Sequence, residues 1–224
     1  MTASARAATP ATALAAGLAE LRLPAELAAP LLHYLDELQR WNRAYNLTAV
    51  RDPLEMVSRH LLDALALVPL LAGPLSSPGR CLLDVGSGAG LPAVPLALAF
   101  PGLAVTALDA NGKKARFLRH VQRQLGLARL SVAEARVEHW QPPQRFDFIT
   151  SRAFASLADF TQLSRPLLAP GGQWLAMKGK LSPAERQALP AGIELVSCRT
   201  LHVPGLDETR QLVVLSEAPS NPNP

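Results

Sequence analysis

From residue 81 onward, short apolar segments alternate with stretches of helical periodicity, and this alternation restricts the fold more than any other feature of the sequence. The apolar segments have the length of buried strands and are bounded by turn-forming residues. We predict strands at residues 81–85, 103–108, 130–133, 146–150, 173–177, 193–198 and 211–215. We predict helices at residues 92–100, 112–125 and 157–168. The expected fold is therefore α/β, with a seven-stranded, mostly parallel sheet.

The part of the chain before residue 73 has helical periodicity only. Apolar side chains recur at steps of three and four residues at Leu31, Leu35, Leu38, Trp41 and Tyr45, and again at Leu54, Val57, Leu61, Leu65 and Val68. Asp52 and Pro53 predict a helix start, and the Gly, Pro and Ser residues of 73–79 predict a connecting loop. We expect a helical extension at 11–73, a ligand-binding domain at 80–216, and disordered tails at 1–10 and 217–224.

Composition and charge exclude several classes of protein. The chain is 49% hydrophobic and 18% charged, with a formal net charge of +4, which predicts a folded protein. Its start has no apolar core of signal-peptide length, and the uncharged segment 85–108 contains too many Gly and Pro residues for a membrane-spanning helix. Cys81 and Cys198 stand far apart without Cys or His at ligand spacing, so we predict inert core thiols and no metal site. We expect a soluble, cytoplasmic protein.

A glycine-rich loop, Asp84-Val85-Gly86-Ser87-Gly88-Ala89-Gly90, follows the first predicted strand. Glycine lets the backbone turn sharply and approach a ligand, and parallel sheets bind ligands at the carboxyl ends of their strands. A dinucleotide fingerprint has its third glycine one position later, where this chain has Leu91. The loop instead resembles the first motif of class I methyltransferases, which bind S-adenosylmethionine.

Two further features agree with a nucleoside ligand. Asp109 ends the second predicted strand, where a carboxylate can accept hydrogen bonds from both ribose hydroxyls. NAD enzymes also have an acidic residue there, so Asp109 does not distinguish the two cofactors. The Pro and Gly residues of 168–172, which precede the fifth predicted strand, form a turn that is also familiar from methyltransferases.

The fourth predicted strand is followed by Ser151-Arg152-Ala153-Phe154, which restricts the methyl acceptor. This is not the Asn- or Asp-Pro-Pro-aromatic segment used on exocyclic amines. A cysteine nucleophile for pyrimidine carbon 5 is not expected, because Cys81 starts the first predicted strand and Cys198 lies in a late one. Lys178 lacks the Asp that would help activate a ribose hydroxyl. Guanine N7 carries a free lone pair, so alignment at about 3–3.5 Å suffices. We predict no catalytic acid or base.

The predicted helix at 112–125 has a basic stripe, with no acidic residue between Ala110 and Ala133. Its members are spaced 3, 3 and 4 residues apart: Lys113, Arg116, Arg119 and Arg123. Uncompensated like charge on one helix face favours an anionic partner such as RNA phosphate, although a solvated cationic face is the alternative. In the helical extension, Trp41 and Tyr45 are predicted as core residues, with base-stacking platforms as the alternative. His60 either orients a loop or is simply packed.

Together these motifs resemble one family, the RsmG (GidB) small-subunit ribosomal RNA methyltransferases. The matching segments are Trp41-Asn42, Asn46-Leu47-Thr48, Arg59-His60-Leu61-Leu62-Asp63, the loop from Asp84 to Pro92, Arg136-Val137-Glu138 and Ser151-Arg152-Ala153-Phe154-Ala155. The resemblance implies a class I (Rossmann-like) fold and transfer of a methyl group from S-adenosylmethionine to N7 of one guanosine of 16S rRNA. That guanosine is guanine 527 of the 530 loop in conventional rRNA numbering.

The resemblance also implies a set of cofactor contacts. They fall on Gly86, Gly88, Leu91, Val137, Glu138 and Arg152, with Asp109 for the ribose from the general fold. Glu134 competes with Glu138 as the acid beside the adenine amine. RNA contacts are expected along the basic stripe, in the context of the small ribosomal subunit. The alternative function is a non-catalytic RNA-binding module on a methyltransferase-like scaffold.

Overall fold

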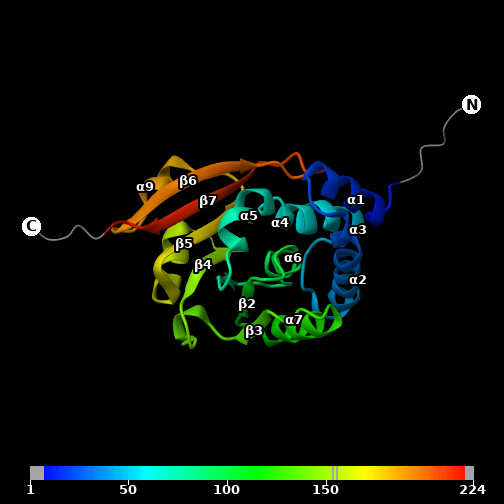
Figure 1. Cartoon of the computed structure of the whole chain (residues 1–224), viewed down its shortest axis with the longest axis horizontal. Coiled ribbons are helices and arrows are strands. Elements are labelled where there is room, and N and C mark those ends of the chain that lie inside the picture. The colour runs from blue at the N-terminus through cyan, green and yellow to red at the C-terminus, as the bar shows by residue number, and fades with distance from the viewer. Residues whose placement is uncertain (1–7, 153, 155, 220–224) are drawn as a thin grey trace, which may run out of the picture.

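The computed structural model describes residues 8–152, 154 and 156–219, and its centre is a seven-stranded sheet in the order β3-β2-β1-β4-β5-β7-β6 (Figure 1). The strands are β1 (Cys81–Val85), β2 (Ala104–Asp109), β3 (Leu130–Glu134), β4 (Phe146–Ser151), β5 (Leu168–Lys178), β6 (Ile193–Leu201) and β7 (Arg210–Glu217). Strands β1 to β5 pair in parallel, whereas β7 is antiparallel to both β5 and β6. The predicted α/β fold with seven strands is confirmed.

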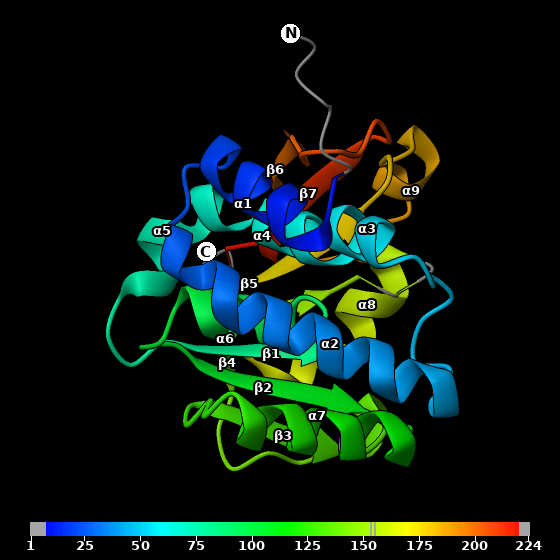
Figure 2. The same ribbon diagram turned by 90° about the vertical axis from the view of Figure 1, so that its right-hand side faces the viewer.

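Helices cover both faces of the sheet. The helices and helical turns are α1 (Pro10–Glu20), η1 (Ala25–Leu27), α2 (Ala28–Tyr45), α3 (Pro53–Met56), η2 (Val57–Leu62), α4 (Asp63–Leu65), α5 (Val68–Ser76), α6 (Ala93–Ala99), α7 (Gly112–Gln124), η3 (Val137–His139), α8 (Leu157–Ser164), η4 (Arg165–Leu167) and α9 (Pro183–Gln187). Figure 2 shows α2 running diagonally across one face with α7 beside it. Apolar side chains of α1 to α7 belong to one core cluster, and those of α8 belong to a second, separate cluster.

The pleat of the strands separates the two clusters. In β1, Leu82 belongs to the cluster beneath α6 and α7, while Leu83 belongs to the cluster beneath α8. Successive side chains of a strand point to opposite faces, so a strand covered on both sides is apolar throughout, and all of β1 is buried. This explains why continuous apolar runs in the sequence gave the strand positions so closely.

The N-terminal helices are part of the same core. Leu14 and Leu18 of α1 are buried, and Thr9 caps this helix, which begins at Pro10. Thr9 and Pro10, which were expected to lie in a tail, are therefore part of the fold. The same is true of Ala218 near the other end, because its N–H donates to the Gly192 carbonyl. The rest of the two expected tails, 1–7 and 220–224, lies outside the described residues.

Two local predictions are wrong. The predicted loop at 73–79 begins only after Ser76, because Leu71 and Leu75, one turn apart, are buried and hold α5 in helical form despite Pro74. The helix start predicted at Asp52 and Pro53 is confirmed, and the helical segment that follows contains the π-helix η2, a form common at functional sites. Strand β5 starts at Leu168, which pairs with Phe146, so the expected turn at 168–172 is an irregular part of the strand.

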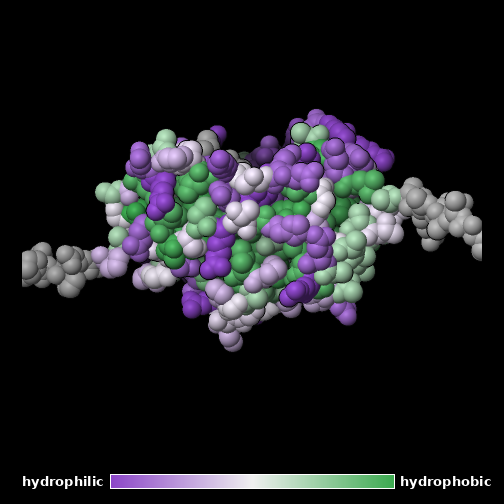
Figure 3. Space-filling view, turned by 90° about the horizontal axis from the view of Figure 1, so that it is seen from above, coloured by the Kyte–Doolittle hydropathy of each residue, from purple (hydrophilic) through white to green (hydrophobic). Residues whose placement is uncertain are grey.

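Few large hydrophobic side chains of the described residues are exposed. Leu54, Leu70 and Val196 are the exposed large hydrophobic residues of the described chain, and hydrophobic residues lie among hydrophilic ones on the face shown in Figure 3. Within the described ranges no single helix is long and apolar enough to cross a membrane. Only Pro53–Leu65 together with Val68–Ser76, bent by 41°, reaches that length and composition.

The hydroxyl of Tyr34 ties α2 to the glycine loop, because it donates to the Ala89 carbonyl over 2.6 Å in a fully buried position. Replacing Tyr34 by Phe leaves that carbonyl without its donor, and we expect the free energy of unfolding to fall by about 1–3 kcal/mol. Urea denaturation of Tyr34→Phe and of the control Tyr45→Phe, whose ring is half-buried on the same helix, measures this. Equal losses in the two variants would contradict a special role for the Tyr34 hydroxyl.

Candidate active site

The glycine loop between β1 and α6 is a tight turn that only glycine fits. Gly86, Gly88 and Gly90 have φ values of 70°, 62° and 94°, in the left-handed region that side chains rarely adopt. A Cβ on Gly90 would also lie 2.7 Å from atoms of Leu118 and Val94. The amides of Gly86 and Ser87 both donate to the Leu108 carbonyl, at 2.9 and 3.0 Å, which fixes the loop to the end of β2. The predicted sharp turn is confirmed.

Asp84 lies beneath this loop and holds it from inside. Its side chain is fully buried, and its Oδ2 accepts hydrogen bonds from the Ser87 hydroxyl at 2.6 Å and the Ala93 amide at 3.2 Å. Oδ1 has no hydrogen-bond partner among residues 8–152, 154 and 156–219. Burial raises the pKa of Asp84 to about 7. The sequence marked Asp84 only as part of a motif, and the structure shows that it links strand, loop and helix.

Asp109 ends β2 next to the loop. Its Oδ2 accepts from the Gly88 amide and its Oδ1 from the Asn111 amide, each at 2.8 Å, and Lys114 Nζ lies 3.7 Å from Oδ2. An ionised carboxylate has about four acceptor positions. The two backbone donors therefore fix its orientation and leave it able to accept hydrogen bonds from a ligand.

A cavity of about 230 Å³, which we call the β2 cavity, opens at the ends of β1 and β2. Four of the predicted cofactor residues line it: Gly86, Asp109, Val137 and Glu138. Gly88 is joined to this group through its bond to Asp109. Glu134 does not line the cavity and instead forms an ion pair with Arg119 at 3.0 Å. Of the two competing acids, Glu138 is the one at the cavity.

Two predicted cofactor residues lie elsewhere. Leu91 is 4% exposed and packs in the core behind the loop, so its side chain does not reach the β2 cavity. Arg152 lines a second cavity of about 410 Å³ at the ends of β4 and β5, which we call the β4 cavity. The sheet order reverses between β1 and β4, so the two cavities lie on either side of the topological switch point, where open α/β sheets bind ligands.

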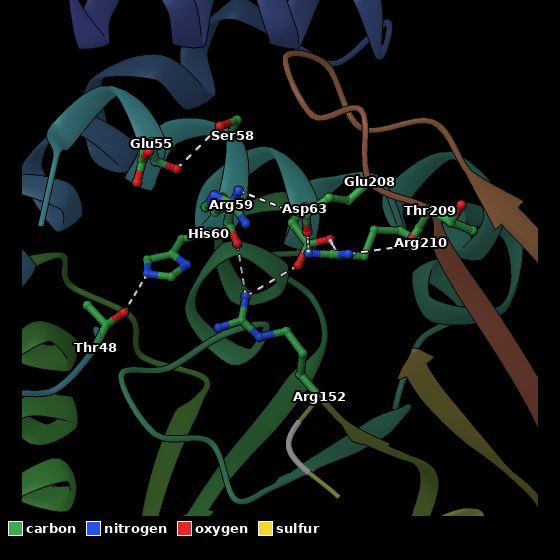
Figure 4. A network of polar contacts seen from close by, with 10 residues as sticks. All are labelled: Thr48, Glu55, Ser58, Arg59, His60, Asp63, Arg152, Glu208, Thr209 and Arg210. Carbon is green, nitrogen blue, oxygen red and sulfur yellow. Dashed lines mark hydrogen bonds and ion pairs between the residues drawn. The ribbon is translucent and has the colours of Figure 1, made fainter. Parts of the chain in front are cut away.

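A network of arginines and carboxylates surrounds the β4 cavity (Figure 4). Asp63 is 2% exposed and meets Arg152 Nη1 through Oδ2 and Arg210 Nε through Oδ1, both at 3.3 Å. Burial raises the pKa of Asp63, and the two guanidinium groups oppose this rise. Glu208 pairs with both Arg59 at 2.7 Å and Arg210 at 2.9 Å. The carboxylates thus hold three arginines in place around one cavity.

His60 enters the same cavity from η2. It is 5% exposed, and its Nε2 lies 2.8 Å from the Thr48 hydroxyl, while Nδ1 has no hydrogen-bond partner within the described part of the chain. Burial lowers the pKa of His60 to about 4, so the ring is neutral near pH 7. The bond to Thr48 agrees with a role in orienting the loop after α2. Sequence analysis missed that Arg59, His60, Asp63 and Arg210 meet at one cavity, since three of them come from the helical extension and one from β7.

The basic stripe on α7 is interrupted. Lys113, Arg116 and Arg123 are exposed, but Arg119 pairs with Glu134, which follows the acid-free segment in sequence. The prediction of an uncompensated stripe is therefore wrong at Arg119, because β3 brings an acid alongside the helix. Next to α7, Trp41 of α2 is half-buried, with its ring 5.6 Å from that of Phe117, which agrees with a packing role.

Only one of the two cysteines lies in the core. Cys81 is buried and donates through Sγ to the Arg145 carbonyl. Cys198 is exposed, because β6 is an edge strand with much of its length open to solvent, so the prediction of two core thiols is wrong for Cys198. Asp147 accepts from Arg80 and from the Cys81 amide, so it has a structural role at the start of β1 and β4. The described residues contain no group of three His, Cys, Asp or Glu side chains that would hold a metal ion.

Known proteins resemble this chain over most of its length. Residues 28–214 match the profile of a family described as rRNA small subunit methyltransferase G (GidB). A relative from Stutzerimonas stutzeri, named ribosomal RNA small subunit methyltransferase G, is 55% identical over 185 residues, or 83% of this chain and 84% of the relative. One of the same name from Chromohalobacter salexigens is 51% identical over 207 residues, or 92% and 96%.

Solved structures share the fold. TrmN from Thermus thermophilus superimposes with a TM-score of 0.56 at 25% identity, over 72% of this chain and 53% of TrmN. A putative methyltransferase from Thermoplasma acidophilum gives a TM-score of 0.52 at 15% identity, over 67% of this chain and 75% of the other. The second likeness concerns the fold alone.

The raised pKa of Asp84 makes stability depend on pH. Its folded-state pKa is about 7, whereas an aspartate in an unfolded chain titrates near about 3.9. Between these values the folded protein holds a proton that the unfolded chain has lost. Its contribution to the free energy of unfolding should therefore fall as pH rises from about 4 to 7, by at most about 1.4 kcal/mol per unit.

We expect Asp84→Asn to remove this slope, because asparagine does not titrate, whereas the exposed Asp36→Asn should keep it. Urea denaturation of the three proteins between pH 4 and about 8 measures the difference. If the Asp84→Asn and native slopes coincide, Asp84 titrates normally and its assigned role under the loop is wrong.

Proposed function

The chain belongs to the rRNA small subunit methyltransferase G family, and on that premise we propose that it methylates N7 of one guanosine of 16S rRNA. The proposed methyl donor is S-adenosyl-L-methionine, and the proposed site is guanine 527 in the 530 loop. The observation that carries the proposal is the left-handed glycine loop beside Asp109 and the β2 cavity, at the switch point of the sheet. We propose that the reaction takes place in the cytoplasm, on the small ribosomal subunit.

The residues at the β2 cavity fit the proposed cofactor. Asp109 keeps acceptor positions for the ribose hydroxyls, and Glu138 and Val137 line the cavity wall where adenine would pack. Gly86 and Gly88 let the chain approach without a Cβ in the way. Leu91 supports the loop from behind, so its part is indirect. When bound, the cofactor supplies a methyl group activated by its sulfonium charge.

Arg152 lies on the β4 side of the site. It follows β4 and lines the β4 cavity, and its charge partly opposes the rise in the pKa of Asp84 that burial causes. A guanidinium in this position would bind the carboxylate of the cofactor's amino-acid tail, which is its proposed role. The acceptor would then enter from the β4 side.

The groups at the end of β4 favour an acceptor that needs no deprotonation. The hydroxyls of Thr150 and Ser151 donate to the carbonyls of Leu175 and Val85, both at 2.8 Å. Both oxygens of the buried Asp63 carboxylate face guanidinium groups, Oδ2 that of Arg152 and Oδ1 that of Arg210, so neither oxygen is directed at an acceptor as a base. Guanine N7 has a lone pair and no proton, so positioning would be enough. These observations support N7 among the possible acceptor atoms.

The RNA surface that we propose includes the exposed members of the α7 stripe. Lys113, Arg116 and Arg123 are exposed, whereas the pairing of Arg119 with Glu134 makes Arg119 a weaker candidate. The N7 edge of a base is hidden in A-form RNA, so the acceptor must lie in an unpaired segment. Phosphate contacts along α7 would offset part of the few kcal/mol needed to extrude the base.

The decisive experiment is methyl transfer to unmodified RNA. We expect purified protein to transfer labelled methyl from S-adenosyl-L-methionine to small-subunit particles or rRNA from cells that lack the protein. Nuclease digestion and mass spectrometry should place the label on N7 of one guanosine. Label on an exocyclic amine or a ribose oxygen would contradict the argument from the missing base. Absence of both transfer and cofactor binding by calorimetry would favour the non-catalytic RNA-binding module.

Reversing charge on α7 should weaken RNA binding. For Arg116→Glu with Arg123→Glu we expect at least about a tenfold loss of RNA affinity at low salt. The slope of the log binding constant against the log salt concentration should become smaller in magnitude by roughly 1.4, as for two lost phosphate contacts. The matched control is Arg186→Glu with Arg199→Glu, two exposed arginines on α9 and β6, far from α7 (Figure 1). Filter binding over a salt series measures both variants. If the two double variants behave alike, α7 is not an RNA surface.

A further inference from the structure

The proton position on the His60 ring follows from how its bond to Thr48 is assigned. The Val50 amide donates to the Thr48 Oγ1 at 3.3 Å, so this oxygen already accepts one bond. We assign the Thr48 hydroxyl as the donor in its 2.8 Å bond with His60 Nε2. With Nε2 accepting, a neutral imidazole carries its proton on Nδ1. Among the described residues Nδ1–H is then a buried donor without a full hydrogen bond, although the Arg59 backbone lies close to the imidazole, and a buried polar group left unpaired is costly.

The free nitrogen faces the β4 cavity. Figure 4 shows the Nδ1 side of the ring turned toward the same space as the Arg152 guanidinium, with Thr48 on the opposite side of the ring. Both His60 and Arg152 line this cavity of about 410 Å³. Its other charged lining residues are Arg59, Arg210, Lys178 and Asp63. Cationic side chains thus outnumber the one carboxylate, so the cavity suits an anionic, polar ligand such as a nucleotide more than an apolar one.

The position of the cavity agrees with an acceptor site. The β2 cavity and the β4 cavity flank the switch point between β1 and β4. A group that receives a methyl from a cofactor bound over β1 and β2 must approach from the neighbouring strands β4 and β5. The β4 cavity is the one that opens there, at Arg152 and Met177.

We propose that the β4 cavity receives the target guanine and that Nδ1–H of His60 donates a hydrogen bond to its O6. This inference rests on the proposed function and names its base-recognition residue. Guanine presents an acceptor at O6, whereas adenine presents an amino donor at the same place. A fixed donor in the site therefore favours guanine over adenine and leaves N7 free to take the methyl group.

The low pKa of His60, about 4, supports this role. The ring stays neutral at physiological pH, so it donates without adding positive charge beside a base that becomes cationic. The Thr48 and Val50 contacts fix the orientation of the ring, which makes the donor specific to one position. A site built to pair with a substrate group rejects an analogue that lacks it, because its own buried group is then unpaired.

The test uses three acceptor bases and two variants. Small-subunit rRNA assembled by ligation carries guanosine, inosine or 2-aminopurine riboside at the target position; all have N7, but 2-aminopurine lacks O6. In His60→Asn the side-chain amide lies near the position that Nδ1 has in native protein, so a donor toward the base is kept. In His60→Gln the amide lies near the position of Nε2, so only the contact with Thr48 is kept. Initial rates give kcat/KM for each pair, and calorimetry with S-adenosylhomocysteine checks that each variant retains cofactor affinity.

For native protein we expect inosine to remain within a few-fold of guanosine and 2-aminopurine to lose about tenfold or more. For His60→Gln we expect kcat/KM on guanosine to fall about tenfold below that of native protein, whereas kcat/KM on 2-aminopurine should change little. The preference for a base with O6 then disappears. His60→Asn should keep the preference. A purely structural role would lower kcat/KM equally on all three bases.

Two outcomes overturn the inference, and they do not depend on one variant. One is an equal fold-loss on guanosine and 2-aminopurine in His60→Gln. The other is equal kcat/KM of native protein for inosine and 2-aminopurine, which needs no variant at all. If native protein does not methylate the guanosine RNA, the proposed function itself fails, and this result is distinguishable from a failure of the His60 assignment alone.

Discussion

The rest of the site depends on how the glycine loop is fixed between β1 and α6. Its three left-handed glycines can turn the chain only because Asp84 binds the loop from below and the Leu108 carbonyl binds it from the side. Tyr34 of α2 adds a third attachment at Ala89. A loop held in this way by buried hydrogen bonds presents its backbone to a ligand without needing to reorganise, which is the main requirement for catalysis by alignment.

The sheet topology converts this one loop into a two-part site. Because the strand order reverses between β1 and β4, the β2 cavity and the β4 cavity lie on opposite sides of the same loop. The helical extension then supplies much of the wall of the β4 cavity, through Arg59, His60 and Asp63 on η2 and α4. The extension is therefore part of the functional site as well as a cover for one face of the sheet.

Positive charge in the β4 cavity is partly compensated by carboxylates. The buried Asp63 alone would be costly, and it is compensated by Arg152, which follows β4, and by Arg210 of β7. Glu208 does the same for Arg59 and Arg210 at the more exposed rim. Such pairing fixes the direction of long side chains, so the cavity can recognise a nucleotide by geometry. His60 differs from these groups because its Nδ1 has no partner in the described chain.

The sequence alone determined the strands, the turn at Gly86 to Gly90 and the place of Asp109, because period, apolar runs and glycine spacing are local properties. It could not show that Arg152 lines another cavity than Glu138, that Glu134 neutralises Arg119, or that Cys198 is exposed on an edge strand. These follow from pairings between residues far apart in the chain. The meeting of His60, Asp63, Arg152 and Arg210 is likewise a product of packing, since no spacing in the sequence specifies which distant side chains will share one cavity.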